Sequence, residues 1–266
     1  MPSYEPAQLL PEVLAIARRA GAAIMEIYAL DFQVEHKDDD SPLTAADLAA
    51  NKVIMEGLKK LTPDIPCLSE EGRDIPFEER RQWPELWIVD PLDGTREFVK
   101  KNGEFTVNIA LVRDGRPVLG VVHCPALRTD YYAAEGAGAF RADAEDEGVP
   151  ISTSATAAEP RIVASRSHRT QELEDFLEKL GDHEALSKGS SLKFCMVAEG
   201  VADFYPRLGP TSEWDTAAGQ AVVELAGGQV LKTDFTPLTY NQRESILNPY
   251  FLVIGDPDYD WQRYFR

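Results

Sequence analysis

The stretch Trp87-Ile-Val-Asp90-Pro-Leu-Asp93-Gly-Thr95 determines the fold and the kind of site that we expect for this chain. The apolar run Leu86-Trp-Ile-Val89 predicts a buried strand, which ends abruptly at Asp90-Pro91. Proline and glycine then fold the chain, so that Asp93 turns back toward Asp90. The segment TREFV, from Thr95 onward, predicts a short helix whose first amide groups have no partner inside the helix.

The two aspartates and the helix start supply the two elements that a phosphate site requires. Paired carboxylates such as Asp90 and Asp93 hold hard cations through their oxygen atoms. The N-terminus of a helix attracts an anion through its amide groups and its dipole. A phosphate group bound between the cation and the helix is the interpretation that we favour. The alternative is an ordinary strand-end turn capped by aspartates.

Two further acidic segments gain significance only beside this stretch. Glu70-Glu71-Gly72 follows a short strand predicted over residues 65–69, and on its own it is more typical of a solvated turn. Asp215 stands at the start of a helix predicted to end at Leu225, where an aspartate is also a preferred N-cap residue. Beside the Asp90–Asp93 stretch, both segments become candidates for the same site.

The composition limits the possible partners. The chain has 266 residues, and its 45 acidic and 27 basic residues give a formal net charge of −18, which disfavours nucleic acid and anionic lipid. The three cysteines are scattered and the four histidines lack zinc spacing. No apolar run is long enough for an integral membrane segment. We therefore expect a cytoplasmic protein, while peripheral attachment at the inner membrane and the oligomeric state stay open.

Hydrophobic periodicity predicts an α/β (α+β) protein. A core-facing helix is expected over residues 7–30, and a second helix is expected to begin with a capping box, Thr44 to Asp47, and to reach Leu61. Its inward residues are expected to be Leu48, Val53, Ile54 and Leu58. The polar stretch 142–160 predicts a boundary. Residues 1–150 then form an α+β domain with most of the metal ligands, and residues 151–266 form an α/β domain with Asp215 and the substrate region.

Four segments together resemble the inositol-monophosphatase superfamily of magnesium-dependent, lithium-sensitive phosphatases. They are Ser41-Pro-Leu-Thr44-Ala-Ala-Asp47, Ser69-Glu70-Glu71-Gly72, Asp90-Pro-Leu-Asp93-Gly-Thr95 and Trp214-Asp215-Thr-Ala-Ala-Gly219. The resemblance covers most of the chain in order and spacing. It implies the layered αβαβα sandwich of the inositol-monophosphatase and sugar-phosphatase type.

Further segments resemble one branch of that superfamily, the bacterial 3'(2'),5'-bisphosphate nucleotidases of sulfate assimilation. They are Thr95–Ala110, Ala164–His168, Gly189–Phe194, Tyr205–Thr211 and Arg243–Pro249. The resemblance implies hydrolysis of the 3'-phosphate of adenosine 3',5'-bisphosphate to AMP and phosphate. A further substrate that it implies is 3'-phosphoadenosine 5'-phosphosulfate.

The resemblance also implies roles for single residues. Two or three Mg2+ ions would be bound by Glu70, Asp90, the carbonyl of Leu92, Asp93 and Asp215. Water would be activated by Asp47 and Thr95, with Glu70 as a third catalytic residue. The substrate would contact Asp93, Gly94, Thr95, Arg96, Ser190, Lys193, Arg207 and Asp215. Lys37 and Asp38–Asp40 fit a loop beside a weakly held metal, although a solvated loop explains them better.

Three questions stay open from the sequence. The same metal motifs would serve an inositol monophosphatase or a sugar-phosphate phosphatase. A non-catalytic scaffold that binds metal or nucleotide is a hypothesis of another class, which the presence of every ligand acid and of Thr95 disfavours. Lys193 and Arg207 would hold the 5'-phosphate away from the metals, although each alone fits a surface charge equally well.

Overall fold

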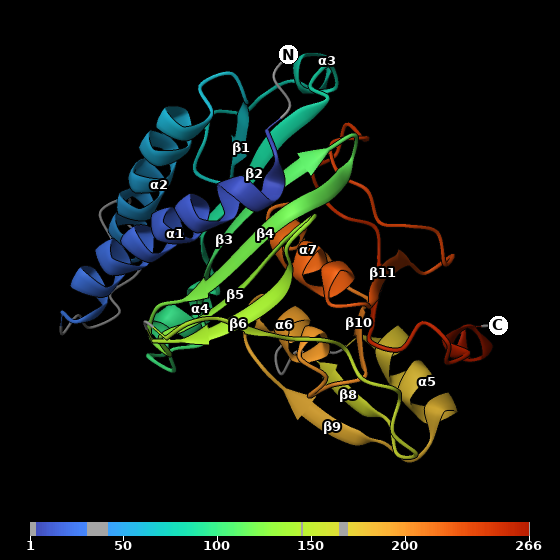
Figure 1. The fold of residues 1–266 in the computed structure, drawn as a ribbon. Helices are drawn as coiled ribbons and strands as arrows, with labels where there is room; N and C mark the ends of the chain where they lie inside the picture. The colour runs from blue at the N-terminus through green and yellow to red at the C-terminus, as the bar shows by residue number, and fades with distance from the viewer. Residues whose placement is uncertain (1–3, 31–41, 145, 165–169, 266) are drawn as a thin grey trace.

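The computed structural model describes residues 4–30, 42–144, 146–164 and 170–265, and its elements stack in five layers (Figure 1). One helix layer, a seven-stranded sheet, a second helix layer, a five-stranded sheet and a last helical layer follow one another. This order confirms the expected αβαβα sandwich. The helical layers consist of α1 (Pro6–Tyr28) and α2 (Pro42–Leu61), then α6 (Leu192–Ala198) and α7 (Ala217–Leu225), and then α5 (Gln171–Leu180) and η1 (Trp261–Tyr264).

The seven-stranded sheet follows the order of the chain, and its neighbours are antiparallel except for the parallel pair β1–β2. Its hairpin between β3 and β4 turns at Asp114-Gly115, and both residues have the positive φ (49° and 79°) that a tight two-residue turn requires. The strands are β1 (Cys67–Ser69), β2 (Glu85–Asp93), β3 (Thr106–Arg113), β4 (Arg116–Cys124), β5 (Thr129–Ala134), β6 (Gly138–Asp143) and β7 (Val149–Pro150).

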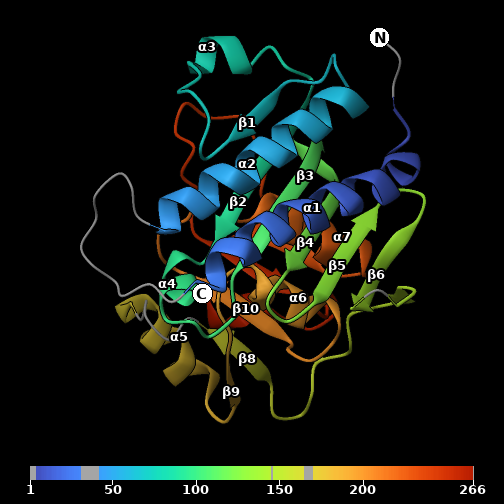
Figure 2. The same cartoon turned by 90° about the vertical axis from the view of Figure 1, so that its left-hand side faces the viewer.

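Helices α1 and α2 lie side by side across one face of this sheet (Figure 2). Helix α1 faces the core as expected, because it buries one stripe of residues at helical spacing: Leu9, Leu10, Val13, Ile16, Ala17, Ala20 and Ile24.

Helix α2 differs from the prediction at its start. It begins at Pro42 rather than at Thr44, because proline is well accepted in the first turn of a helix. Its buried stripe runs through Ala46, Asp47, Ala50, Ile54 and Leu58. Leu48 falls off that stripe and is 50% exposed, so its inward assignment is wrong, and Asp47 faces inward instead.

The five-stranded sheet has the order β11-β12-β10-β8-β9. β8 pairs in parallel with β9 and β10, whereas β12 runs antiparallel between β10 and β11. β9 was not predicted, because it is largely exposed and carries no alternating pattern. The strands are β8 (Arg161–Ala164), β9 (Glu184–Ser187), β10 (Phe204–Arg207), β11 (Gln229–Lys232) and β12 (Phe251–Ile254).

Helix α7 joins the two sheets. It packs against β3, β4 and β5 on one side and against β11 on the other. At Gly120 of β4, a Cβ atom would lie 2.4 Å from the carbonyl oxygen of Ala218, so this close approach requires glycine. The surrounding core takes side chains from both halves of the chain, among them Val122 and Val223. Among the described residues, no helix has both the length and the apolar character that crossing a bilayer requires.

Candidate active site

The end of β2 carries a bulge that places two acids at the edge of the sheet. Asp90 pairs with Asn108 and Asp93 with Thr106, so β2 has one more residue than β3 in this interval. The expectation that the strand ends at Asp90 is therefore wrong. Pro91 lies in the bulge, where its missing N–H breaks no ladder bond. The N–H of Leu92 donates to Oδ1 of Asp90 at 3.0 Å.

Gly94 makes the turn from this bulge into α4 (Thr95–Val99), the short helix that was predicted. Its φ is +94°, and a Cβ atom here would lie 3.2 Å from Cβ of Ser190 and 3.3 Å from Cα of Phe105. Both the backbone conformation and the crowding therefore require glycine.

Three acids from distant parts of the chain meet beside the bulge. Glu70 follows β1, Asp90 lies in β2 and Asp215 precedes α7, and one carboxylate oxygen from each lies within 4.8 Å of the other two. Asp90 is only 1% exposed, and its Oδ2 has no hydrogen-bond partner among the described residues. The structure thus brings together three acids that the sequence assigned to one metal site.

The electrostatics of this cluster favour a bound cation. Burial and the charges of Asp93, Glu70, Asp215 and Asp47 raise the pKa of Asp90 well above its ordinary value. Burial and the charge of Asp93 also raise the pKa of Glu70, and raise that of Asp215 to about 7. Such mutual repulsion among buried oxygens is what a hard divalent ion relieves, so the residues present suit magnesium.

Asp47 extends the acidic cluster from α2. Burial, followed by the charges of Glu71 and Glu70, raises its pKa to about 8. Its Oδ1 is buried and has no hydrogen-bond partner in the described part of the chain. An unsatisfied buried oxygen costs free energy, so this position is suited to a group that donates a hydrogen bond, such as water.

Ser191 holds the carboxylate of Asp93 and was missed by the sequence reasoning. Its N–H and hydroxyl lie 2.7 and 2.9 Å from Oδ2 of Asp93, and the hydroxyl also lies 2.8 Å from the carbonyl oxygen of Asp215. Nδ2 of Asn108 donates to the same hydroxyl at 2.9 Å. Since one hydroxyl proton serves one acceptor at a time, the N–H is the constant anchor of Asp93.

Asp215 is held in the loop before α7 rather than as a helix cap. Thr216 occupies the N-cap position, and α7 begins at Ala217. Oδ2 of Asp215 instead accepts a 2.9 Å hydrogen bond from the N–H of Ser212. The N-cap interpretation of Asp215 is therefore wrong.

A cavity of about 290 Å³ opens beside the acids. Basic residues of both halves of the chain contribute to its wall. All the residues predicted to contact substrate line it, namely Asp93, Gly94, Thr95, Arg96, Ser190, Lys193, Arg207 and Asp215. The cavity therefore joins an acidic floor to a cationic wall, as a phosphorylated ligand with a bound metal would need.

Lys193 and Arg207 differ from ordinary surface charges. Lys193 is only 7% exposed, and its Nζ donates to the carbonyl oxygen of Ser190 at 2.6 Å and lies over the ring of Tyr205. Burial lowers the pKa of Lys193 to about 8, although Asp93 opposes this shift. Arg207 donates to the carbonyl of Pro210 at 2.7 Å, while its Nε is buried without a partner among the described residues.

Some predicted segments lie outside the described residues. These are Lys37 with Asp38–Asp40, Ser41 of the segment Ser41–Asp47, and the Ser165–His168 part of the segment that starts at Ala164.

Comparison with known proteins agrees with the fold. The model of the inositol monophosphatase family matches residues 5–255. The 3'(2'),5'-bisphosphate nucleotidase CysQ of Salmonella typhimurium is 54% identical over 248 residues, which cover 92% of this chain and 99% of the relative. The protein of the same name from Haemophilus influenzae is 40% identical over 260 residues, which cover 97% of each chain.

Solved structures give the same picture. CysQ from Bacteroides thetaiotaomicron, described as a bacterial member of the inositol monophosphatase family, is 43% identical, with a TM-score of 0.83 and coverage of 96% of this chain and 99% of its own. An inositol monophosphatase from Zymomonas mobilis, at 24% identity, has a TM-score of 0.80 over 99% of this chain and 98% of its own, which shows the shared fold.

Proposed function

Because the chain belongs to the inositol monophosphatase family, we propose that it is a magnesium-dependent 3'(2'),5'-bisphosphate nucleotidase. It removes the 3'-phosphate of adenosine 3',5'-bisphosphate and releases AMP and phosphate. Its second substrate is 3'-phosphoadenosine 5'-phosphosulfate, so the enzyme serves sulfate assimilation. The proposal follows the names of relatives that are 40% to 54% identical over most of the chain.

One observation carries the proposal beyond these names. The acids Glu70, Asp90 and Asp215 converge next to a cavity whose wall contains the buried Lys193 and the partly exposed Arg207. A substrate with one phosphate needs only the acidic floor and its metal. A second, separate cationic wall is suited to a second phosphate.

The metal would be held by Glu70, Asp90, the carbonyl of Leu92, Asp93 and Asp215, in two or three sites. Magnesium bound there would polarise the attacking water and offset the charge that builds up on the phosphoryl group. The chain itself contributes orientation. Ser191 fixes Asp93 and the loop at Ser212 fixes Asp215, so the carboxylates are set before any ion arrives.

Other residues of the chain would act on the water and the phosphate. Thr95 and Asp47 would orient the water and accept its proton, with Glu70 assisting. The buried, unsatisfied Oδ1 of Asp47 supports this role. The phosphate to be cleaved would rest on the turn Asp93–Arg96, where Gly94 allows the backbone to approach it closely.

Lys193, Arg207 and Ser190 would hold the 5'-phosphate. We also propose that the chain is organised as two domains, residues 1–150 and 151–266, with the substrate between them. The first supplies the acids up to Asp93, and the second supplies Asp215 and the seat of the 5'-phosphate.

Phosphate release from a substrate panel tests the proposal. Adenosine 3',5'-bisphosphate, 3'-AMP and inositol 1-phosphate are compared at equal concentration, with magnesium and with a chelator. We expect the bisphosphate to have the highest kcat/KM and all activity to vanish with the chelator. A preference for inositol phosphate would favour the inositol-phosphatase alternative. Activity that persists in the chelator would overturn the metal-dependent mechanism.

A further inference from the structure

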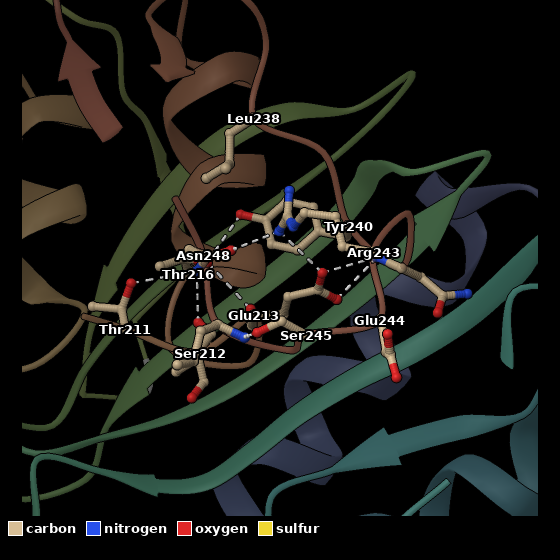
Figure 3. A network of polar contacts seen from close by, with 12 residues as sticks. Thr211, Ser212, Glu213, Thr216, Leu238, Tyr240, Arg243, Glu244, Ser245 and Asn248 are labelled. Carbon is tan, nitrogen blue, oxygen red and sulfur yellow. Dashed lines mark hydrogen bonds and ion pairs between the residues drawn. The ribbon is translucent and has the colours of Figure 1, made fainter. Parts of the chain in front are cut away.

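The segment 238–248 folds over the loop that carries Asp215, and a buried polar network joins the two (Figure 3). The network contains part of the motif Arg243–Pro249, to which the proposed mechanism gives no role. The N–H of Asn248 donates to the carbonyl of Thr211 at 2.8 Å, and the N–H of Glu213 donates to the carbonyl of Ile246 at 2.9 Å. The two segments therefore run alongside each other like a short pair of strands.

The side chain of Asn248 reaches into the loop. It is 7% exposed, and its Nδ2 donates to the carbonyl oxygen of Ser212 at 2.8 Å and to Oγ1 of Thr216 at 2.9 Å. Figure 3 shows these bonds at one end of the network. The orientation of the amide is unambiguous, because the Ser212 carbonyl can only accept and must face the NH2 group.

Asn248 therefore forms hydrogen bonds to both peptide groups that flank Ser212. Its backbone N–H holds the Thr211–Ser212 peptide through the Thr211 carbonyl. The opposite side of that same peptide, the Ser212 N–H, donates to Oδ2 of Asp215 at 2.9 Å. The side chain of Asn248 binds the Ser212–Glu213 peptide through the Ser212 carbonyl. That carbonyl also accepts from the N–H of Asp215 at 3.3 Å.

The far end of the network anchors the segment independently of Asn248. The carboxylate of Glu213 is fully buried and accepts from the N–H of Asn241 at 2.9 Å and from Arg243 at 3.2 Å. The guanidinium of Arg80, in α3 (Phe77–Arg80), donates to Oδ1 of Asn241 at 2.9 Å. In return, Nδ2 of Asn241 donates to the backbone carbonyl of Arg80. A substitution of the Asn248 side chain should therefore leave the segment in place.

We propose that Asn248 is a positioning residue, which sets the carboxylate of Asp215 toward Glu70 and Asp90 through Ser212. The inference rests on the proposed function, since it assigns the purpose of this contact to metal binding. With Oδ2 pinned by the Ser212 N–H, the other oxygen of Asp215 is presented to a cation. Loss of a residue that orients a metal ligand typically weakens metal binding by about 10- to 100-fold.

The test substitutes Asn248 by leucine, which has a similar volume and no donor. Manganese chloride is titrated into metal-free protein by calorimetry, and activity is measured against magnesium concentration. For Asn248→Leu we expect the metal dissociation constant to rise about ten-fold or more, which corresponds to about 1.4 kcal/mol. The magnesium concentration for half-maximal activity should rise in parallel, while kcat at saturating magnesium stays near that of the wild type.

Tyr240→Phe is the matched control. It also removes a buried donor from the network, because the hydroxyl of Tyr240 contacts Oγ1 of Thr216 at 3.1 Å and Oε1 of Gln220 at 2.8 Å. It leaves both peptides of Ser212 untouched, so metal affinity should stay the same. An equal loss of metal affinity in both variants would show that any weakening of the polar network lowers the affinity. It would overturn the assignment to Asn248.

Two outcomes separate this inference from the proposed function. If the wild-type protein binds no metal, both the proposed function and the inference are contradicted. Wild-type binding that Asn248→Leu leaves unchanged overturns the inference alone. If the leucine variant does not fold, Asn248→Asp replaces it, because it keeps the shape and loses the donors. Unchanged affinity in that variant equally overturns the inference.

Discussion

The N–H of Ser191 donates a 2.7 Å hydrogen bond to the carboxylate of Asp93, which lies 98 positions earlier in the chain. The bond joins the start of α6 to the bulge of β2 and fixes one oxygen of an acid that lines the cavity. The site is therefore closed by contacts between the two halves of the chain rather than by local structure alone.

Asp93→Asn should abolish turnover and leave the fold intact. The asparagine carbonyl can still accept the Ser191 N–H, and the change removes one charge from a repelling group of acids. We expect less than about a tenth of wild-type kcat at saturating magnesium, with an unchanged circular dichroism spectrum and an unfolding temperature no lower than that of the metal-free wild type. Activity above that level would show that Asp93 is not a metal ligand.

Arg207→Ala should raise KM for adenosine 3',5'-bisphosphate by about ten-fold or more, or about 1.4 kcal/mol, because the 5'-phosphate loses a charged partner. Hydrolysis of 3'-AMP, which lacks that phosphate, should barely change. Arg73→Ala is the control, since Arg73 is exposed and pairs only with Glu79 in the described contacts. Equal losses on both substrates would assign Arg207 to the fold or to the metal site. No loss on either would place the 5'-phosphate elsewhere.

The stability of the metal-free protein should fall as pH rises from about 5 to 8. The pKa of Asp47 is raised to about 8 and that of Asp215 to about 7, so the folded state keeps protons that the unfolded state has already released. Magnesium favours the ionised acids, so the rise in unfolding temperature on adding magnesium should be larger at pH 8 than at pH 6.

Scanning calorimetry with chelator or magnesium measures this difference. Asp90→Asn is the matched variant, because it removes a buried carboxylate whose pKa is raised well above its ordinary value, and it should flatten the pH dependence of the metal-free protein. If magnesium raises the unfolding temperature equally at both pH values, the raised pKa values of these acids are not linked to metal binding.

Lithium should inhibit the enzyme at millimolar concentration. A small monovalent ion in the acidic cluster offsets less negative charge than magnesium does, and should therefore trap the product instead of supporting release. Initial rates over a lithium series, with sodium at equal ionic strength as the control, measure this effect. Full activity in lithium at tens of millimolar would separate this protein from the lithium-sensitive phosphatases that it resembles.

Much of the fold could be predicted from local patterns. The short helix α4 has the predicted bounds, and the predicted buried strand Leu86–Val89 lies within β2, because each is a short run beside turn residues. The start of α2 and the exposed strand β9 could not be predicted, since Thr44 also resembles a helix cap and the sequence Glu-Ala-Leu-Ser has no alternating pattern.

The acids of the candidate site were predictable, but the groups that hold them were not. Asp90 and Asp93 stand in a motif with turn residues at fixed offsets, which a single sequence displays. Ser191 touches Asp93 only because the residue before α6 lies against Asn108 of β3, and no local pattern encodes a contact across 98 positions. Sequence reasoning instead singled out the neighbouring Ser190, which lines the cavity.

The place of β12 in the second sheet has a consequence for synthesis on the ribosome. Among the described residues, 251–254 form the last strand, yet they lie inside the sheet between β10 and β11. A nascent chain can assemble the seven-stranded sheet early, whereas β10 keeps one unpaired edge until residues 251–254 have left the ribosome. The half that carries Asp90 and Asp93 is therefore made before the half that closes the site, and until β12 is made the open edge of β10 can pair with other chains.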